Sequence, residues 1–175
     1  DRLHNMRTLD SMKREKQLKI SSETVYVYAP LAHRMGLYNI KTEMEDLAMK
    51  YMEPDVYKDI AKKLAETKKD RSKYINEFIK PIKDKLEKAN LNAEIYGRPK
   101  SIHSIWNKMK KKGVEFEEVY DLFAIRAILD SPPEREKEDC WKVYSMITDE
   151  YTPSPERLRD WLSNPKSNGY EALHT

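Results

Sequence analysis

Side chains that could handle a polyphosphate gather within one short stretch of the sequence. On a helix, at about 100° per residue, Lys100, Ser104, Lys108 and Lys111 cluster on one face, which then offers cations and a hydroxyl. Arg98 precedes this face, and the carboxylate of Asp121 follows it after a glycine. Cations bind phosphate oxygens and a carboxylate binds a divalent metal, so these are the parts from which a magnesium nucleotide site is commonly built.

Two kinds of element must position these side chains. Apolar residues at i, i+3, i+4 and i+7 predict an amphipathic helix whose buried face holds Ile102, Ile105, Trp106 and Met109. Residues 120–130 form an almost continuous apolar run, which predicts a buried strand, and residues 91–96 alternate as a first strand does. We therefore expect a carboxylate at the end of a buried strand, close to the start of a cationic helix.

The same residues also allow a purely structural interpretation. The lysine run 110–112 can be a solvated helix end that complements the helix dipole. Asp121 could cap a turn, and Arg126 could pair with it. The residue types alone leave both interpretations open.

Composition limits the classes of protein. A chain of 175 residues can form one large or two small domains. Charged residues make up 36% and the mean hydropathy is -0.88, which fits long solvated helices and leaves no apolar span for a membrane. The net charge of +3 means that an anion site must come from local clustering. The single cysteine, Cys140, allows no intramolecular disulfide, is consistent with a reducing cytoplasm, and is expected to pack beside Trp141.

The first part of the chain has the periodicity of helices. Residues 1–17 carry apolar side chains at helical spacing, and Ser21 or Ser22 is expected to cap the start of the next helix. Pro30 should kink that helix or set its first turn anew.

Further helices are predicted up to residue 90. Gly36 marks a turn, and an apolar stripe over residues 37–51 predicts a long helix that ends near Pro54. Residues 55–90 continue the helical pattern, which Pro81 should bend or interrupt.

The last third of the chain alternates polar segments with short elements. Residues 131–139 are charged and contain prolines, which favours an exposed, mobile loop. A helix is expected around residues 141–147, and the sequence Asn168-Gly169 indicates a turn near the end of the chain.

Three strings of this sequence resemble one protein family. GRPKSIHSIWNKM (97–109) with EVYDLFAIRAILD (118–130) resembles the synthetase domain of the RelA/SpoT homologues, the (p)ppGpp synthetases. PKSNGYEALHT (165–175) is similar to the guanine-site loop of that domain almost residue for residue. DRLHNMRTL (1–9) resembles the last conserved helix of the HD-type metal hydrolase domain that precedes the synthetase in the family.

The resemblance implies a fold and a division into domains. The fold would be α+β: an N-terminal helical segment followed by a nucleotidyltransferase-like domain, with a mixed β-sheet and flanking helices. Residues 1–20 would be the incomplete end of the hydrolase domain, residues 21–90 a helical connector, and residues 91–175 the synthetase domain without its C-terminal part.

The implied activity is transfer of a pyrophosphoryl group from ATP to the 3′-hydroxyl of GTP or GDP, with Mg²⁺ as cofactor, in the stringent response. The resemblance gives three roles to the side chains that would bind ATP. Arg98 and Arg126 would flank the adenine, and Asp121 would bind the metal. The phosphates would be held by Lys100, Ser104 and Lys108. Four of them would carry catalysis: Asp121, Arg98, Lys100 and Lys108.

The resemblance also assigns the acceptor nucleotide to the last part of the chain. Tyr170 would stack on the guanine, although by itself it can equally be a tyrosine packed after a turn. Lys166 and Asn168 would contact the base or its phosphates, and His174 would lie near the phosphates of the acceptor.

Two features suggest a bifunctional synthetase and hydrolase as the parent. Arg157 and Arg159 belong to a basic string similar to that of bifunctional members, and we expect them on the GTP or GDP side. Asp1 would be a ligand of the hydrolase Mn²⁺ and Asn5 would face its nucleotide, whereas Asp1 and His4 taken alone suit a surface helix as well. Since the other ligands of that metal are absent, we expect no hydrolase activity from this chain.

The chain is expected to be an excerpt of a longer cytoplasmic protein. It opens on Asp1 rather than methionine, and it ends at Thr175, before the strand that carries the catalytic glutamate in the family. We therefore expect it to bind ATP and GTP or GDP but to turn them over poorly. The ribosome and a regulatory C-terminal region would be partners of the full-length parent only.

Two other classes of function remain open at this point. A nucleic-acid-binding module would explain the basic helix and the interleaved aromatic residues, although it does not require Asp121 and the near-neutral charge disfavours it. A helical regulatory fragment without catalysis would explain residues 1–90 but gives the final loop no role.

Overall fold

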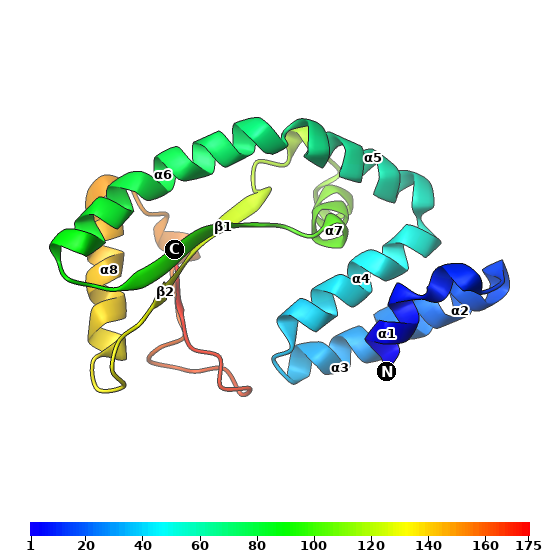
Figure 1. Cartoon of the computed structure of the whole chain (residues 1–175), viewed down its shortest axis with the longest axis horizontal. Coiled ribbons are helices and arrows are strands. Elements are labelled where there is room, and N and C mark those ends of the chain that lie inside the picture. The colour runs from blue at the N-terminus through cyan, green and yellow to red at the C-terminus, as the bar shows by residue number, and fades with distance from the viewer. The chain divides into compact units, whose positions relative to one another are not determined.

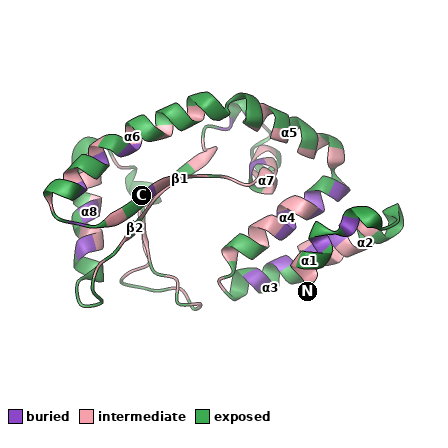
Figure 2. Ribbon diagram, viewed as in Figure 1, coloured by how far each residue is buried: buried purple, intermediate pink, exposed green.

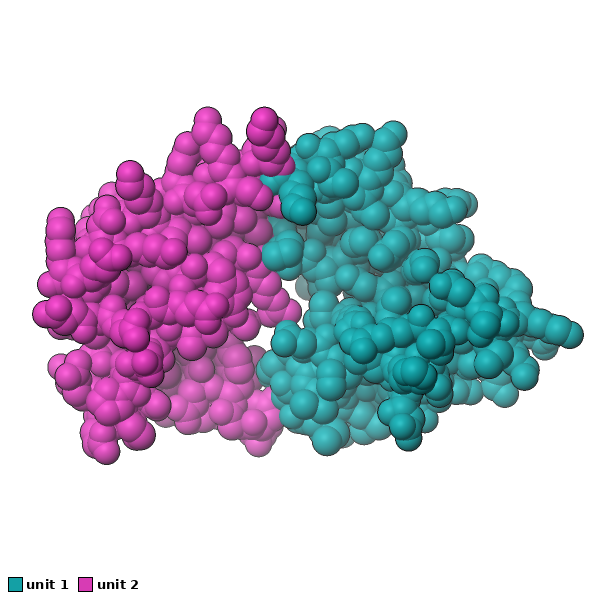
Figure 3. Space-filling view, viewed as in Figure 1, with its two compact units in different colours: residues 1–68, 99–122 teal, residues 69–98, 123–175 magenta.

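The computed structural model describes all of residues 1–175, which pack as two compact units (Figures 1 and 3). Unit 1 comprises residues 1–68 and 99–122, and unit 2 comprises residues 69–98 and 123–175. Each unit therefore combines two stretches that are separated in the sequence.

Unit 1 is helical, and α4 is its central element, because it contacts α1, α2, α3, α5 and α7. Its elements are α1 (Arg2–Arg7), η1 (Leu9–Ser11), α2 (Arg14–Glu23), the π-helical η2 (Thr24–Tyr28), α3 (Ala29–Arg34), α4 (Tyr38–Met52), α5 (Pro54–Glu66), α7 (Ile102–Lys112) and η3 (Phe116–Glu118). Three apolar clusters include residues of α4: one around Met6 and Leu9, one around Ile60 and Ile105, and one around Ala29 and Ala32.

The predicted helix start at Ser21 or Ser22 is wrong. Helix α2 begins at Arg14 and continues past both serines, and Ser21 is fully buried. A serine that is small enough for a close helix contact is tolerated inside a helix, so packing overrides its preference for a cap. Pro30 lies in the first turn of α3, directly after the π-helical turn η2, so the helix changes its hydrogen-bonding pattern just before the proline.

The later helical predictions are confirmed in outline. Gly36 has a positive φ of 73° at the predicted turn, and α4 ends just before Pro54. The pattern over residues 55–90 is split between α5 and α6 at Thr67, whereas α6 continues through Pro81 without interruption. Buried side chains before and after the proline, including Ile79 and Ile82, attach both parts of α6 to one core.

Unit 2 contains α6 (Lys68–Lys88), β1 (Ala93–Pro99), β2 (Phe123–Leu129), α8 (Glu136–Glu150), η4 (Pro155–Arg157), β3 (Arg159–Asp160) and β4 (Leu173–His174). Strands β1 and β2 are antiparallel, because the Asp130 N–H donates to the Asn92 carbonyl at 2.9 Å at the end where β1 begins and β2 ends. Strands β3 and β4 form a second antiparallel pair, with Arg159 opposite His174. The α+β class is confirmed, and its strands form two separate pairs.

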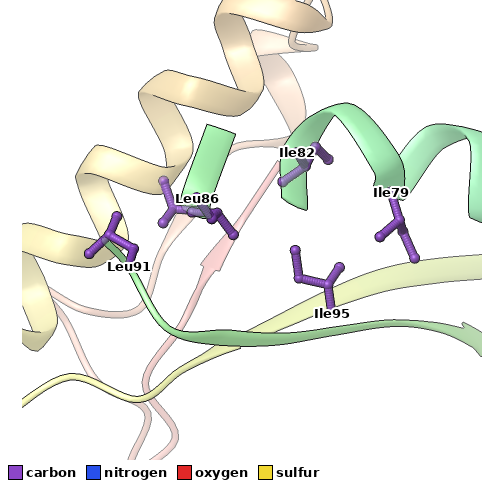
Figure 4. Close-up of a cluster of buried hydrophobic side chains, with 6 residues drawn as sticks. Ile79, Ile82, Leu86, Leu91 and Ile95 are labelled. Carbon is purple, nitrogen blue, oxygen red and sulfur yellow. The ribbon is translucent and has the colours of Figure 1, made fainter. Parts of the chain in front are cut away.

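The core of unit 2 lies on one face of β1 and β2 (Figure 4). Its buried members come from α6, β1, the turn between them and α8: Ile79, Ile82, Leu86, Leu91, Ile95 and Val143. Strand β2 adds Ile125 and Ala127 to this core, while Ala124 and Ile128 on its other face are exposed. Figure 2 shows how burial varies along the elements of the chain. The predicted strand over residues 120–130 is present as Phe123–Leu129, but its prediction as buried is wrong for one face, since a two-stranded antiparallel sheet needs only one covered face.

The predicted exposed loop over residues 131–139 is also partly wrong. Helix α8 begins at Glu136, and Asp139 inside it is buried. Its carboxylate accepts a hydrogen bond from the Ser131 hydroxyl at 2.7 Å and is paired with Arg135 at 3.2 Å, so this segment is tied to the helix.

No helix has both the length and the apolar character needed to cross a membrane.

Substituting alanine for Gly97 should destabilise unit 2 by about 1–3 kcal/mol, because it overpacks the core. A Cβ atom there would lie 2.6 Å from Cγ2 of Ile75. In an Ile75→Ala background the same substitution should cost far less, since the clashing atoms are gone. Urea unfolding of the four proteins measures this as a double-mutant cycle. An equal cost of Gly97→Ala in both backgrounds would contradict the steric explanation.

Candidate functional site

Asp121 lies between two lysines in unit 1, of which Lys108 is on α7 while Lys100 precedes that helix, so the prediction that both lie on one helix face is wrong for Lys100. The Lys108 ammonium contacts Asp121 Oδ2 at 2.7 Å, and the Lys100 ammonium contacts the same oxygen. Burial acts to raise the pKa of Asp121, but the hydrogen bonds from Lys100 and Lys108 outweigh it and leave that pKa below its ordinary value. The carboxylate is therefore ionised at neutral pH, and two positive charges face one negative charge.

Backbone pairing holds the two ends of this cluster together. Lys100 follows β1 and Asp121 precedes β2, and the Lys100 N–H donates to the Leu122 carbonyl at 2.9 Å. Lys108 comes from α7, which is fixed by its apolar face: Ile105 is buried among Met49, Ile60 and Phe116. Within unit 1, the backbone bond between Lys100 and Leu122 and the packing of α7 thus bring both lysines to one carboxylate oxygen.

The ends of α7 are capped by local side chains and backbone. The Ser101 hydroxyl oxygen accepts the Ser104 N–H at 3.2 Å, and the Ser101 hydroxyl donates to the Ser104 hydroxyl at 2.8 Å. Gly113 ends the helix in the left-handed conformation with φ 64°, which favours glycine. The hydroxyl of Ser104, a predicted ATP-binding group, is thus part of the helix cap.

Asp46 of α4 binds the first turn of α7, a contact that the sequence did not predict. Its carboxylate accepts the backbone N–H of His103 at 2.8 Å and that of Ile102 at 3.3 Å. Burial raises the pKa of the Asp46 carboxyl, and the two backbone donors offset this only in part. Beside it, Glu45 lies 3.5 Å from His103 Nδ1 and 2.8 Å from the Lys41 ammonium. No periodicity or motif marks these acids, because they lie 56 or more residues from the helix they contact.

Arg98 and Arg126 of unit 2 share a face of the first strand pair. The antiparallel register places Asn92 beside Asp130, so Tyr96 lies opposite Arg126 and Arg98 opposite Ala124. Residues opposite each other, or two apart on one strand, project from the same face. The two arginines therefore lie on the face away from the core of unit 2.

The predicted guanine loop connects β3 and β4 as a hairpin. Gly169 forms the expected turn with φ 74°, and its N–H donates to the Lys166 carbonyl at 2.8 Å. The Asn168 side-chain oxygen accepts the Tyr170 N–H at 3.2 Å, and the Lys166 N–H donates to the Tyr170 carbonyl at 3.1 Å. These bonds fix the backbone at the residues that the resemblance assigns to guanine.

The side chains of this hairpin form a compact aromatic and cationic group. The Lys166 ammonium lies 4.8 Å from the ring centroid of Trp161 and 5.0 Å from that of Tyr170. The Tyr170 hydroxyl is 2.8 Å from His174 Nε2, and the two rings meet edge to face. The sequence did not predict that Trp161 belongs to this group. The signal that could have indicated it is an aromatic residue near the NGY string.

The two arginines of the basic string are placed differently. Arg159 in β3 donates from Nη1 to the carbonyls of Glu156 and Leu158 at 2.9 and 2.8 Å, so it stabilises its own loop. Arg157 lies in η4 and is exposed.

At the other end of the chain, Asp1 flanks α1 and His4 is exposed in it. No group of three or more His, Cys, Asp or Glu side chains that could hold a metal ion is found in this chain, so Asp1 by itself does not form a metal site here. Asp121, as a single carboxylate, fits a Mg²⁺ whose other ligands are nucleotide phosphates and water.

Comparison with known proteins supplies a context for these groups. Residues 97–175 match the model of the region found in RelA / SpoT proteins, and residues 1–38 match that of an HD domain. The whole chain is 39% identical to a GTP pyrophosphokinase of Photobacterium angustum and 41% identical to one of Myxococcus xanthus. It is also 39% identical to a guanosine-3′,5′-bis(diphosphate) 3′-pyrophosphohydrolase of Aquifex aeolicus. It covers 23%, 22% and 25% of these relatives, about a quarter of their length.

Replacing Lys166 by methionine should raise the pKa of His174. Desolvation, Lys166 and Arg126 together hold this pKa below the ordinary value of 6.5, and the substitution removes one of the two positive charges. NMR titration of the His174 ring measures the change, with Lys80→Met on exposed α6 surface as the control. An unchanged pKa in the Lys166 variant would show that the ammonium does not act on the ring.

The depressed pKa of His174 also predicts how stability depends on pH. The unfolded chain binds a proton at His174 more readily than the folded chain does. The contribution of this residue to the free energy of unfolding is therefore fully present above pH 6.5. Its contribution should be lost as the pH falls through the folded-state pKa. Denaturant unfolding of the chain and of His174→Gln at several pH values measures the difference. If the free energy of unfolding changes with pH in the same way in both proteins, this prediction is contradicted.

Proposed function

Because the chain belongs to the RelA/SpoT family, we propose that it is part of a (p)ppGpp synthetase that transfers a pyrophosphoryl group from ATP to the 3′-hydroxyl of GTP or GDP. The observation that carries this proposal is the pairing of Lys100 and Lys108 with Asp121, which supplies cations and a metal-binding carboxylate in one place. The relatives named GTP pyrophosphokinase support the choice of reaction.

The reaction needs charge neutralisation more than it needs covalent chemistry from the protein. The acceptor 3′-oxygen attacks the β-phosphorus of ATP and forms the new bond there. The bond between the β-phosphorus and the oxygen that bridges to the α-phosphate breaks, so AMP departs with that bridging oxygen. The hydroxyl proton must pass to a base, and negative charge grows on the departing AMP. Positioned cations stabilise that charge, and positioning of this kind accounts for most of the catalysis in phosphoryl transfer.

Lys100 and Lys108 are proposed to bind the ATP phosphates, together with Ser104. In the structure their ammonium groups neutralise Asp121, and a bound polyphosphate offers them stronger anionic partners. Asp121 would then hold Mg²⁺, which when bound bridges phosphate oxygens and withdraws their charge. Arg98 and Arg126 are proposed to flank the adenine, a role to which planar guanidinium groups are suited.

The β3–β4 hairpin is proposed to bind GTP or GDP. Tyr170 would stack on the guanine, and Lys166, which lies over its ring, would turn to the base or its phosphates. Asn168, His174, Arg157 and Arg159 complete the proposed set.

We also propose that the parent is a bifunctional cytoplasmic enzyme, since its relatives carry the names of both opposing activities. Residues 1–20 would then end an Mn²⁺-dependent hydrolase domain with Asp1 as one ligand, residues 21–90 would form a helical connector, and residues 91–175 would belong to the synthetase. The HD match extends beyond the first of these bounds, to residue 38, and the match to the RelA / SpoT region begins at residue 97. The assigned residues include no base for the 3′-hydroxyl, so these 175 residues should bind nucleotides better than they turn them over.

Calorimetric titration tests the acceptor site. The chain should bind GDP more tightly than ADP at the hairpin, and Tyr170→Ala should weaken GDP binding about tenfold or more, as expected for the loss of one stacked base. Tyr26→Ala serves as the control, because Tyr26 is an exposed tyrosine outside the hairpin. If GDP binds no better than ADP and the Tyr170 substitution changes nothing in a folded chain, the hairpin is not a guanine site.

Titration with a non-hydrolysable ATP analogue tests the phosphate site. Lys108→Met should weaken binding about tenfold or more, because one charge-assisted contact is lost. Lys110→Met is the matched control on the same helix, since Lys110 lies over Trp106 and does not contact Asp121.

Mg²⁺ should strengthen binding of the analogue to the unsubstituted chain, and Asp121→Asn should remove most of that gain. Equal effects of Mg²⁺ on both proteins would exclude Asp121 as a metal ligand.

A further inference from the structure

We propose that Asp46 is a positioning residue for the phosphate site: by binding the first turn of α7 it sets the rotation of that helix, and with it the reach of Lys108 toward Asp121. The inference rests on the proposed function, because it concerns how well the same lysines are presented to ATP. It adds a residue of the helical connector to a site otherwise made of residues 100–121.

The contacts of Asp46 leave no backbone donor of the first turn of α7 without a partner. Asp46 accepts the N–H groups of Ile102 and His103, Ser101 Oγ accepts that of Ser104, and the Ser101 carbonyl accepts that of Ile105 at 3.0 Å. The start of a helix ordinarily attracts a phosphate through these donors. Here a carboxylate of α4 takes that place, so binding of phosphate depends on lysine side chains and on how the helix presents them.

Asp46 lies on a part of α4 that also packs against α7. One turn further along α4, Met49 is buried with Ile105 of α7 and Ile60 of α5. Glu45 and the Asp46 carboxylate both face His103, through its ring and its N–H respectively. An apolar contact alone allows two helices to slide or rotate, whereas hydrogen bonds to two specific N–H groups define one rotation.

The rotation of α7 matters because the two lysines meet at one oxygen. Lys100 is fixed by the backbone pairing beside β1 and β2, so it does not follow the helix. Lys108 lies more than one turn into α7 and reaches the same Oδ2 atom at 2.7 Å. Each residue of helix turns by about 100°, so a modest change in rotation carries the Lys108 ammonium away from the position that it shares with Lys100.

Asp46→Asn tests the inference with little change in volume. The amide keeps one acceptor oxygen and loses the other along with the charge, so one of the two N–H groups loses its acceptor. Glu43→Gln is the matched control: it is the same change on the same helix, at a carboxylate that binds Arg7 at 2.8 Å instead of α7. Asp46→Ala, which removes both acceptors, provides a second variant where circular dichroism confirms that it folds.

Two measurements on the whole chain separate docking from function. Amide hydrogen exchange at Ile102 and His103 should become faster in Asp46→Asn and stay unchanged in Glu43→Gln. Affinity for a non-hydrolysable ATP analogue with Mg²⁺ should fall about fivefold to tenfold in Asp46→Asn, by the loss of a charge-assisted hydrogen bond, while affinity for GDP stays the same.

The outcomes distinguish this inference from the proposed function. Faster exchange with unchanged affinity for the analogue would overturn the positioning role and leave the synthetase proposal intact. An equal loss of affinity for the analogue and for GDP would also overturn it, because it would show general destabilisation. Failure of the unsubstituted chain to bind either nucleotide would overturn the proposed function and this inference with it.

Discussion

The excess of positive charge around Asp121 is the constraint on which the candidate site depends. Two ammonium groups cannot both be neutralised by one carboxylate, so the cluster keeps a net attraction for anions although the chain as a whole is nearly neutral. That attraction is local and therefore depends on geometry. Within unit 1, the backbone bond from Lys100 to Leu122 holds the first lysine and α7 carries Lys108, and α4 in turn binds that helix.

The sequence was informative wherever a contact is short in sequence or follows from periodicity. The apolar stripe from Ile102 to Met109 predicted α7 with its buried face, and the spacing placed Lys108 on its polar side, whereas Lys100 lies before the helix. The sequence Asn168-Gly169 predicted a turn, and the structure has a turn there. The meeting of Lys108 with Asp121 followed because only a short segment separates the helix from the strand.

Contacts between distant segments were beyond such reasoning. Asp46 is one of several acids on α4, and nothing in its neighbours shows that it binds the backbone of another helix. Ser21 has the preference of a cap but is buried by packing of α2. The roles assigned to Arg98, Arg126, Tyr170 and the other nucleotide-binding residues came from family resemblance and not from physical deduction, and they stay predictions.

The chain crosses between its two units three times, after residues 68, 98 and 122, and this has a consequence for synthesis on the ribosome. Unit 1 lacks α7 until residue 112 has emerged, so Met49 and Ile60 have no partner in Ile105 while α4 and α5 already exist. Vectorial folding therefore leaves an apolar surface open during translation of the intervening β1 segment. A nascent chain stalled near residue 98 would expose that surface, which makes it a candidate for chaperone binding at this stage of its synthesis.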